Sequence, residues 1–145
     1  MFSFITACFT DDNYWKGMCN MTPAMSRIPL GFFPTPLHEL KNLSAHMGGP
    51  RIWIKRDDCT GLALGGNKVR KLEYILADAL QKNADVLITV GAVTSNHARQ
   101  TAAAAAVLGL ECHLVLIGRP PESKQGITCW MTCWEPKRSV FPTAW

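Results

Sequence analysis

The order of periodic segments along this chain predicts an α/β fold with a parallel sheet and flanking helices. Residues 69–80 place apolar side chains at helical spacing, and residues 86–90 form a continuous strand-like apolar run. A second strand-like run follows at 112–117, after an alanine-rich segment with helical character. Strands that alternate with helices in this way pair in parallel through right-handed crossovers.

The segments before residue 69 predict a less regular entry into this fold. Residues 33–37 read Phe-Pro-Thr-Pro-Leu, a proline-stiffened extended segment. Residues 37–47 are expected to form a short helix that ends at Gly48, Gly49 and Pro50. Residues 51–56 alternate between polar and apolar side chains and predict a strand, the first of the parallel sheet.

The central elements have clear boundaries. The helix over 69–80 presents one apolar stripe, and the run 86–90 is typical of a parallel strand buried on both faces. Gly91 ends that strand, and Ser95 or Asn96 can cap the helix that follows. This helix is expected to end at Gly109, before the strand over 112–117.

Composition places few constraints on function. The 145 residues suit one domain, 48% of them are hydrophobic, and the net charge of +4 is too small to indicate nucleic-acid binding. The basic excess between residues 51 and 71 fits either an anionic ligand or a solvated surface. Six scattered cysteines show no zinc spacing and fit a reducing, cytoplasmic location, with Cys112 as a buried apolar residue. We expect no metal, no membrane span and no signal peptide.

The stretch over 61–71, Gly-Leu-Ala-Leu-Gly-Gly-Asn-Lys-Val-Arg-Lys, carries the strongest chemical signal. Gly65 and Gly66 permit positive φ and a close ligand approach, and they hold Lys68 at the start of a helix. A lysine held in this way is a candidate for Schiff-base formation. A phosphate-binding P-loop is excluded, because Asn67 stands where that motif requires lysine and Val69 offers no hydroxyl.

A second candidate loop, residues 91–97, reads Gly-Ala-Val-Thr-Ser-Asn-His and leads into a helix. Ligands of open α/β sheets bind beyond the carboxyl ends of the strands, and free N–H groups at a helix start favour an anion such as a carboxylate. Ser95 and Asn96 add a hydroxyl and an amide there. The alternatives remain that Ser95 or Asn96 is only a helix cap and that His97 is a hydrogen-bonded structural histidine.

Several motifs together resemble one enzyme family. They are Pro-Thr-Pro-Leu at 34–37, Lys-Arg-Asp-Asp at 55–58, Gly-Leu-Ala-Leu-Gly-Gly-Asn-Lys at 61–68, Arg-Lys-Leu-Glu at 70–73, and Ser-Asn-His-Ala-Arg-Gln-Thr-Ala-Ala-Ala at 95–104. They resemble the pyridoxal-phosphate-dependent family of D-cysteine desulfhydrases and 1-aminocyclopropane-1-carboxylate deaminases, which has the fold of the tryptophan synthase β subunit (fold type II).

The resemblance implies roles for the residues of both loops. Lys68 would hold pyridoxal 5'-phosphate through a Schiff base and then move protons. Asn67 and Asn96 would lie near the ring and phenolic oxygen of the cofactor. Ser95, together with Asn96 and His97, would receive the carboxylate of a small amino-acid substrate. A complete family member is expected to form a homodimer.

The resemblance also implies a reaction, with alternatives. His97 stands where the deaminase branch typically has glutamine, which favours a D-cysteine desulfhydrase-like lyase that releases pyruvate, ammonia and sulfide. The alternatives are a 1-aminocyclopropane-1-carboxylate deaminase and a catalytically inactive truncated fragment or isoform. Family members are much longer than this chain, and the resemblance stops after Glu122. We therefore divide the chain into an irregular N-terminal extension (1–26), a partial pyridoxal-phosphate-enzyme domain (27–122) and an atypical C-terminal tail (123–145).

Overall fold

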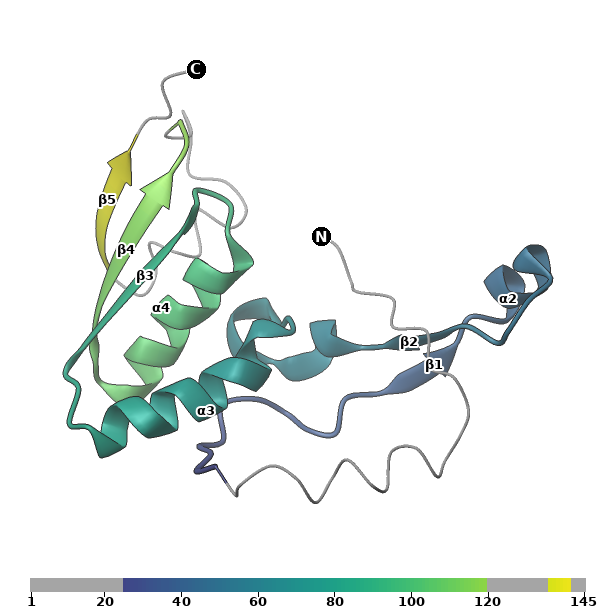
Figure 1. The fold of residues 1–145 in the computed structure, drawn as a ribbon, viewed down its shortest axis with the longest axis horizontal. Coiled ribbons are helices and arrows are strands. Elements are labelled where there is room, and N and C mark those ends of the chain that lie inside the picture. The colour runs from purple at the N-terminus through teal and green to yellow at the C-terminus, as the bar shows by residue number, and fades with distance from the viewer. Residues whose placement is uncertain (1–24, 120–135, 142–145) are drawn as a thin grey trace.

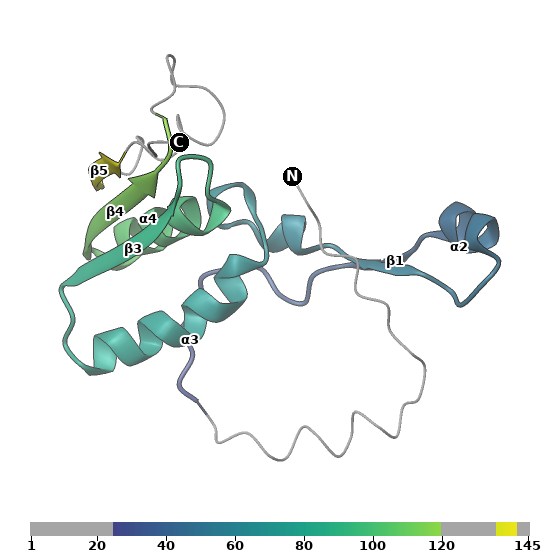
Figure 2. The ribbon, with the colours of Figure 1, turned by 45° about the horizontal axis from the view of Figure 1, so that its top comes forward.

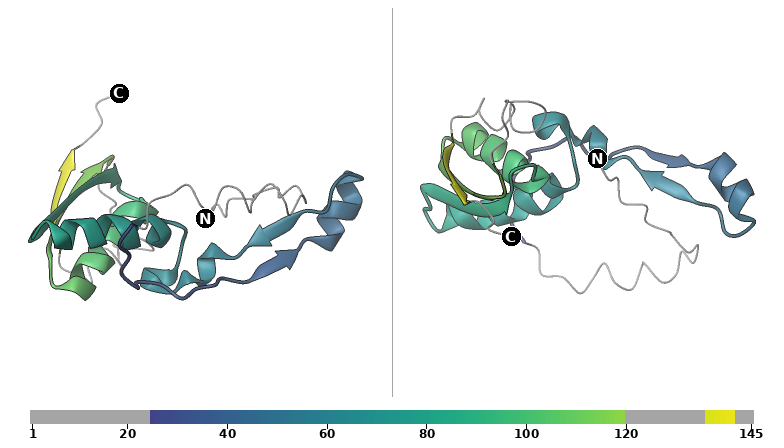
Figure 3. Two further views of the ribbon diagram at one scale, coloured as in Figure 1. Left: turned by 60° about the horizontal axis from the view of Figure 1, so that its bottom comes forward. Right: turned by 90° about the horizontal axis from the view of Figure 1, so that it is seen from above.

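The computed structural model describes residues 25–119 and 136–141, which form an α/β body and a projecting arm (Figure 1). The body holds a three-stranded sheet with helices α3 and α4, and the arm holds two short strands and helix α2. The arm extends away from the body in every view (Figures 1, 2 and 3).

The arm is a small antiparallel hairpin. Strand β1 (Leu37–Glu39) pairs with β2 (Trp53–Lys55), and helix α2 (Lys41–Met47) lies between them. The prediction of one helix over 37–47 is wrong for its first three residues, because their backbone groups pair with β2. The predicted helix end is confirmed, since Gly48 adopts a φ of +61° and closes α2.

The body contains a parallel sheet in the order β3-β4-β5. Its strands are β3 (Val86–Ala92), β4 (Glu111–Ile117) and β5 (Lys137–Phe141). The strand predicted over 51–56 exists, but it belongs to the arm and not to this sheet. Its polar–apolar alternation is typical of a hairpin strand with one solvated face. The third parallel strand comes instead from residues 137–141, where the sequence shows no usable period.

Helix α4 (Asn96–Leu108) covers one face of the sheet, and α3 (Lys68–Gln81) packs beside it (Figure 2). Small side chains of α4 meet larger ones of β4 in the main core cluster: Ala98, Ala102, Ala105, Cys112, Leu114 and Leu116. A second cluster joins Leu72 and Leu76 of α3 to Ala104 of α4. The predicted burial of Cys112 is confirmed, and burial raises its thiol pKa to about 11.

The opposite face of the sheet is uncovered in the described part of the chain. Ile88 is 73% exposed and Val90 is 58% exposed, while Leu87, which points to the other face, packs against the core. The prediction that the run 86–90 is buried on both faces is therefore wrong for these residues. None of the described helices is both long and apolar enough to span a membrane, and the described side chains form no metal-binding group of histidine, cysteine and carboxylate residues.

Candidate functional site

Two 3₁₀ turns, η1 (Asp57–Thr60) and η2 (Leu62–Leu64), lead from the arm to Lys68. Thr60 is fully buried and organises this segment. Its hydroxyl accepts the Gly66 N–H at 2.9 Å and lies 3.0 Å from the carbonyl oxygens of Asp57 and Gly66. The loop before Lys68 is thus closed on itself by internal hydrogen bonds.

Gly65 and Gly66 adopt the predicted positive φ values, +73° and +134°. A Cβ atom at Gly65 would lie 1.9 Å from the carbonyl oxygen of Asp58, and one at Gly66 would lie 2.2 Å from Nε2 of Gln100. The close approach expected of a ligand at these glycines is therefore made by the protein itself. The turn needs glycine in order to pack, and it delivers Lys68 to the first position of α3.

The second loop ends in a helix cap. Ser95 is the N-cap residue of α4, and its Oγ accepts the Ala98 N–H at 3.2 Å, so the capping interpretation of Ser95 is confirmed. A hydroxyl that accepts one hydrogen bond still has its own proton to donate. The cap therefore leaves Ser95 able to donate to an anion at the N-terminus of α4.

The structure brings the Lys68 loop and the His97 loop together. His97 is partly buried, and its pKa is lowered mainly by burial and further by the positive charges of Lys71 and Lys68. Its Nδ1 is buried and has no hydrogen-bond partner among the described residues. The imidazole is thus neutral near pH 7 and lies within electrostatic reach of the Lys68 amine.

Both asparagines lie at helix starts. Asn67 occupies the N-cap position of α3, but its side chain makes no capping hydrogen bond. The Oδ1 of Asn96 accepts a hydrogen bond from Arg99 at 3.0 Å. Arg99 and Gln100 both donate to the carbonyl oxygen of Gly65, at 3.2 and 2.9 Å, and so join α4 to the glycine turn.

Sequence reasoning missed two ion pairs made by helix α3, the helix that follows the glycine turn. Arg70 pairs with both carboxylate oxygens of Asp57 at 2.7 Å, and this pairing lowers the pKa of Asp57. The buried Glu73 carboxylate accepts the backbone N–H groups of Leu30 and Gly31 and pairs with Arg27 at 2.5 Å. The motifs at 55–58 and 70–73 contain Asp57, Arg70 and Glu73, so part of each motif serves the folded structure and not the chemistry of the site.

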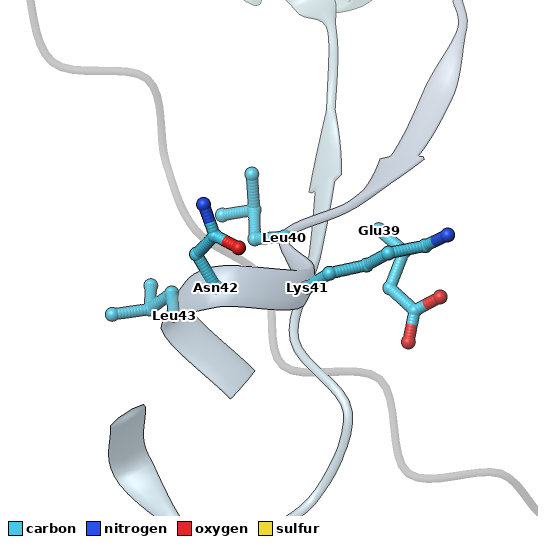
Figure 4. A pocket seen from close by; sticks show the side chains of 5 residues that line it. All are labelled: Glu39, Leu40, Lys41, Asn42 and Leu43. Atoms are coloured by element: carbon cyan, nitrogen blue, oxygen red, sulfur yellow. The ribbon is translucent and has the colours of Figure 1, made fainter. Parts of the chain in front are cut away.

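A hollow of about 440 Å³ lies at the start of α2 and is lined by Glu39, Leu40, Lys41, Asn42 and Leu43 (Figure 4). It belongs to the arm, apart from the N-termini of α3 and α4 (Figure 1). Its side chains point outward in different directions and do not converge on one point. The candidate site is therefore the meeting point of the two loops and not this hollow.

The chain is similar to known proteins. The family model of pyridoxal-phosphate dependent enzymes matches residues 28–128. The chain is 54% identical over 97 residues to a 1-aminocyclopropane-1-carboxylate deaminase of Bradyrhizobium diazoefficiens, covering 66% of this chain and 29% of that protein. It is 57% identical over 91 residues to the deaminase of Burkholderia ambifaria, covering 61% of this chain and 27% of that protein.

A solved structure is similar as well. The crystal structure of a 1-aminocyclopropane-1-carboxylate (ACC) deaminase homologue superimposes with a TM-score of 0.76 at 46% sequence identity, over 83% of this chain and 36% of that chain. The α/β architecture of fold type II is thereby confirmed for the matched part. The chain spans less than a third of the length of these two curated deaminases.

Proposed function

Because the chain belongs to the family of pyridoxal-phosphate dependent enzymes, we propose that it forms the lysine-bearing part of a lyase that deaminates 1-aminocyclopropane-1-carboxylate. The observation that carries this proposal is the meeting of Lys68, at the start of α3, with the partly buried His97 at the start of α4. The identities above 50% to proteins named as deaminases support this substrate.

The residues present fit the aldehyde end of the cofactor. The meeting point offers the amine of Lys68, the amide groups of Asn67 and Asn96, and the buried Nδ1 of His97, which has no hydrogen-bond partner in the described part of the chain. When bound, pyridoxal phosphate supplies an electron sink that stabilises negative charge at a substrate carbon. Lys68 would hold the cofactor and move a proton at the reacting carbon.

The N-terminus of α4 suits the substrate carboxylate. The first N–H groups of a helix lack intrahelical partners, and the helix dipole is positive at this end. Ser95 adds a hydroxyl donor, since accepting the Ala98 N–H does not use the proton of the hydroxyl. Ser95 and Asn96 would thus orient the amino acid with its amine towards Lys68.

A second candidate substrate is D-cysteine, and the observation that favours it is His97. Burial and the neighbouring lysines keep this imidazole neutral, and its Nδ1 is unpaired in the described structure. A neutral imidazole can accept a thiol proton from a substrate and return it to a leaving group. The names of the relatives favour the deaminase, and D-cysteine desulfhydrase activity is the alternative.

Covalent trapping tests the role of Lys68. Borohydride reduction of the purified protein loaded with pyridoxal phosphate should place the cofactor on Lys68, as read by peptide mapping. Lys71→Arg keeps Lys68 and should still be labelled there, whereas Lys68→Arg keeps the charge and should lose the label. Labelling spread evenly over the lysines would contradict the proposal.

Substrate choice is tested by comparing turnover of 1-aminocyclopropane-1-carboxylate and D-cysteine under equal conditions. Faster deamination of the cyclopropane is expected, and faster sulfide release from D-cysteine would reverse the order of the two candidates. Lys68 labelling without turnover of either amino acid would support the third hypothesis, an inactive fragment that retains the lysine.

A further inference from the structure

Two successive residues of α4 hold the glycine turn. Arg99 and Gln100, 3% and 0% exposed, both donate to the carbonyl oxygen of Gly65. The same Nη2 of Arg99 also donates to Oδ1 of Asn96 at 3.0 Å. We call this set of contacts the Gly65 clamp: Arg99 and Gln100 as donors, Gly65 and Asn96 as acceptors.

Burying Arg99 at this position costs free energy of folding. Its Nε and Nη1 are buried and have no hydrogen-bond partner among the described residues, and no carboxylate in that part of the chain pairs with it. A buried cation without a paired anion opposes folding. Within the described structure, only the contacts of Nη2 with Gly65 and Asn96 offset the cost of burying this cation.

Geometry defines that role. Arginine has only N–H donors, so the atom of Asn96 that faces it must be the amide oxygen and not the amide nitrogen. The NH₂ group of Asn96 is then directed away from the guanidinium, with its two protons available to an acceptor. In an isolated asparagine the two orientations differ little, and the hydrogen-bond network decides between them.

We infer that Arg99 is a positioning residue, which fixes the side-chain amide of Asn96 as a donor towards the cofactor and ties it to the turn that carries Lys68. This inference rests on the proposed function, since it assigns Asn96 a ligand. The clamp joins residues 31 positions apart in sequence, Gly65 and Asn96, through one planar group. The Lys68 loop and the N-terminus of α4 are thereby held in a fixed relative position.

Lysine would hold the two acceptors less rigidly than arginine, because both contacts come from one nitrogen, Nη2, whose two protons are fixed in the guanidinium plane. A guanidinium presents several donors in a rigid plane, whereas an ammonium is a mobile point charge on a flexible stem. Arg99→Lys keeps the charge and removes the planar fork, and Arg99→Met removes both at similar volume. Arg27→Lys is the matched control, because Arg27 also binds a buried acceptor, Glu73, but takes no part in the clamp.

The first experiment needs no cofactor. In isotope-labelled wild-type protein, the side-chain amide of Asn96 should give one narrow pair of NMR signals with contacts that define a single orientation. Arg99→Lys and Arg99→Met should broaden or split this pair, and Arg27→Lys should leave it unchanged. A single unchanged orientation in Arg99→Met would overturn the inference, even if that variant melts at a lower temperature.

The second experiment measures the consequence for the site. Pyridoxal phosphate is titrated into each variant, and binding is followed by visible absorption, induced circular dichroism and reductive labelling of Lys68. Both Arg99 variants should weaken binding by about tenfold to a hundredfold, the scale of one charge-assisted hydrogen bond, with a reduced circular dichroism signal per bound cofactor. Full binding and an unchanged dichroism signal in Arg99→Lys would contradict the positioning role of Arg99 and would show that only its positive charge matters.

The two experiments separate the possible failures. Absence of Lys68 labelling in the wild type would defeat the proposed function, while the NMR signals of Asn96 would still decide whether Arg99 orients the amide. If Lys68 is labelled in the wild type but the NMR signals of the Asn96 amide do not change in the Arg99 variants, the inference fails and the proposed function stands.

Discussion

The arm and the body differ in where they keep their polar groups. Helix α2 of the arm buries no residue, and the hollow at its start is lined by outward-pointing side chains. The body buries Thr60, Arg99 and Gln100 around the glycine turn and the start of α4, and it buries Glu73 on α3. Buried polar groups must be held by specific partners, so they fix geometry in a way that an open hollow cannot. Chemistry in this molecule is therefore expected in the body.

The largest effect should follow Gly65→Ala. The new Cβ would lie 1.9 Å from the carbonyl oxygen of Asp58, at a φ of +73°, so the turn must rebuild. We expect a loss of more than about 3 kcal/mol in the free energy of unfolding, measured by urea denaturation. Gly49→Ala in the arm is the control, because its nearest heavy atom is 3.9 Å away and its φ is not positive. Equal stability of the two variants would remove the distinction between body and arm.

Sequence reasoning found helices α3 and α4 and strands β3 and β4 of the body, because their signals are local, and it missed strand β5. The stripe of α3, the Ser95 cap and the end of α4 at Gly109 follow from spacing and capping chemistry, and the structure confirms all three. It failed for the arm, where three residues predicted as helix form a strand. Leu37–Glu39 become a strand only because Trp53–Lys55 lie opposite, and no local pattern encodes that partner.

Sequence reasoning found part of the candidate site from local signals, and it missed the residues that matter through contacts distant in sequence. Lys68 and Ser95 stand out because glycines and a helix start mark them in sequence. Thr60 and Arg99 carry no such mark, and their importance arises from contacts with residues distant in sequence or from burial. The roles of Lys68, Asn67, Ser95, Asn96 and His97 in binding remain predictions.

A second prediction concerns the buried Glu73 of helix α3. Glu73→Gln replaces a buried acceptor of two backbone N–H groups and of the Arg27 guanidinium with a neutral amide. We expect a loss of about 1–3 kcal/mol, because the amide oxygen can keep both backbone N–H groups only if the NH₂ group faces Nε of Arg27, and the charged partner of Arg27 is removed. Asp78→Asn breaks the exposed pair with Lys82 and should have no measurable effect on unfolding by urea. A Glu73→Gln variant as stable as Asp78→Asn would show that burial adds nothing to this ion pair.

A third prediction uses pH. Pairing with Arg70 lowers the pKa of Asp57 below its ordinary value of about 3.9, so the carboxylate stabilises the folded state at neutral pH. Since Asp57 remains partly exposed, we expect Asp57→Asn to cost only about 0.5–1 kcal/mol at pH 7. The difference between wild type and variant should shrink as the pH falls from about 4 through the lowered pKa. A difference that stays constant down to pH 2 would assign the effect to packing and not to charge.

The smallest effect is expected on the uncovered face of the sheet, and it is informative because it is small. Ile88 is 73% exposed, and threonine is also β-branched, so Ile88→Thr should change the free energy of unfolding by less than about 0.5 kcal/mol. Leu114→Ala on the helix-covered face is the contrast, because that side chain is 1% exposed and its loss should cost about 2–5 kcal/mol. Unfolding is measured at two protein concentrations. A large loss for Ile88→Thr that grows with protein concentration would show that this face is covered by another chain in solution, since only an intermolecular contact depends on concentration.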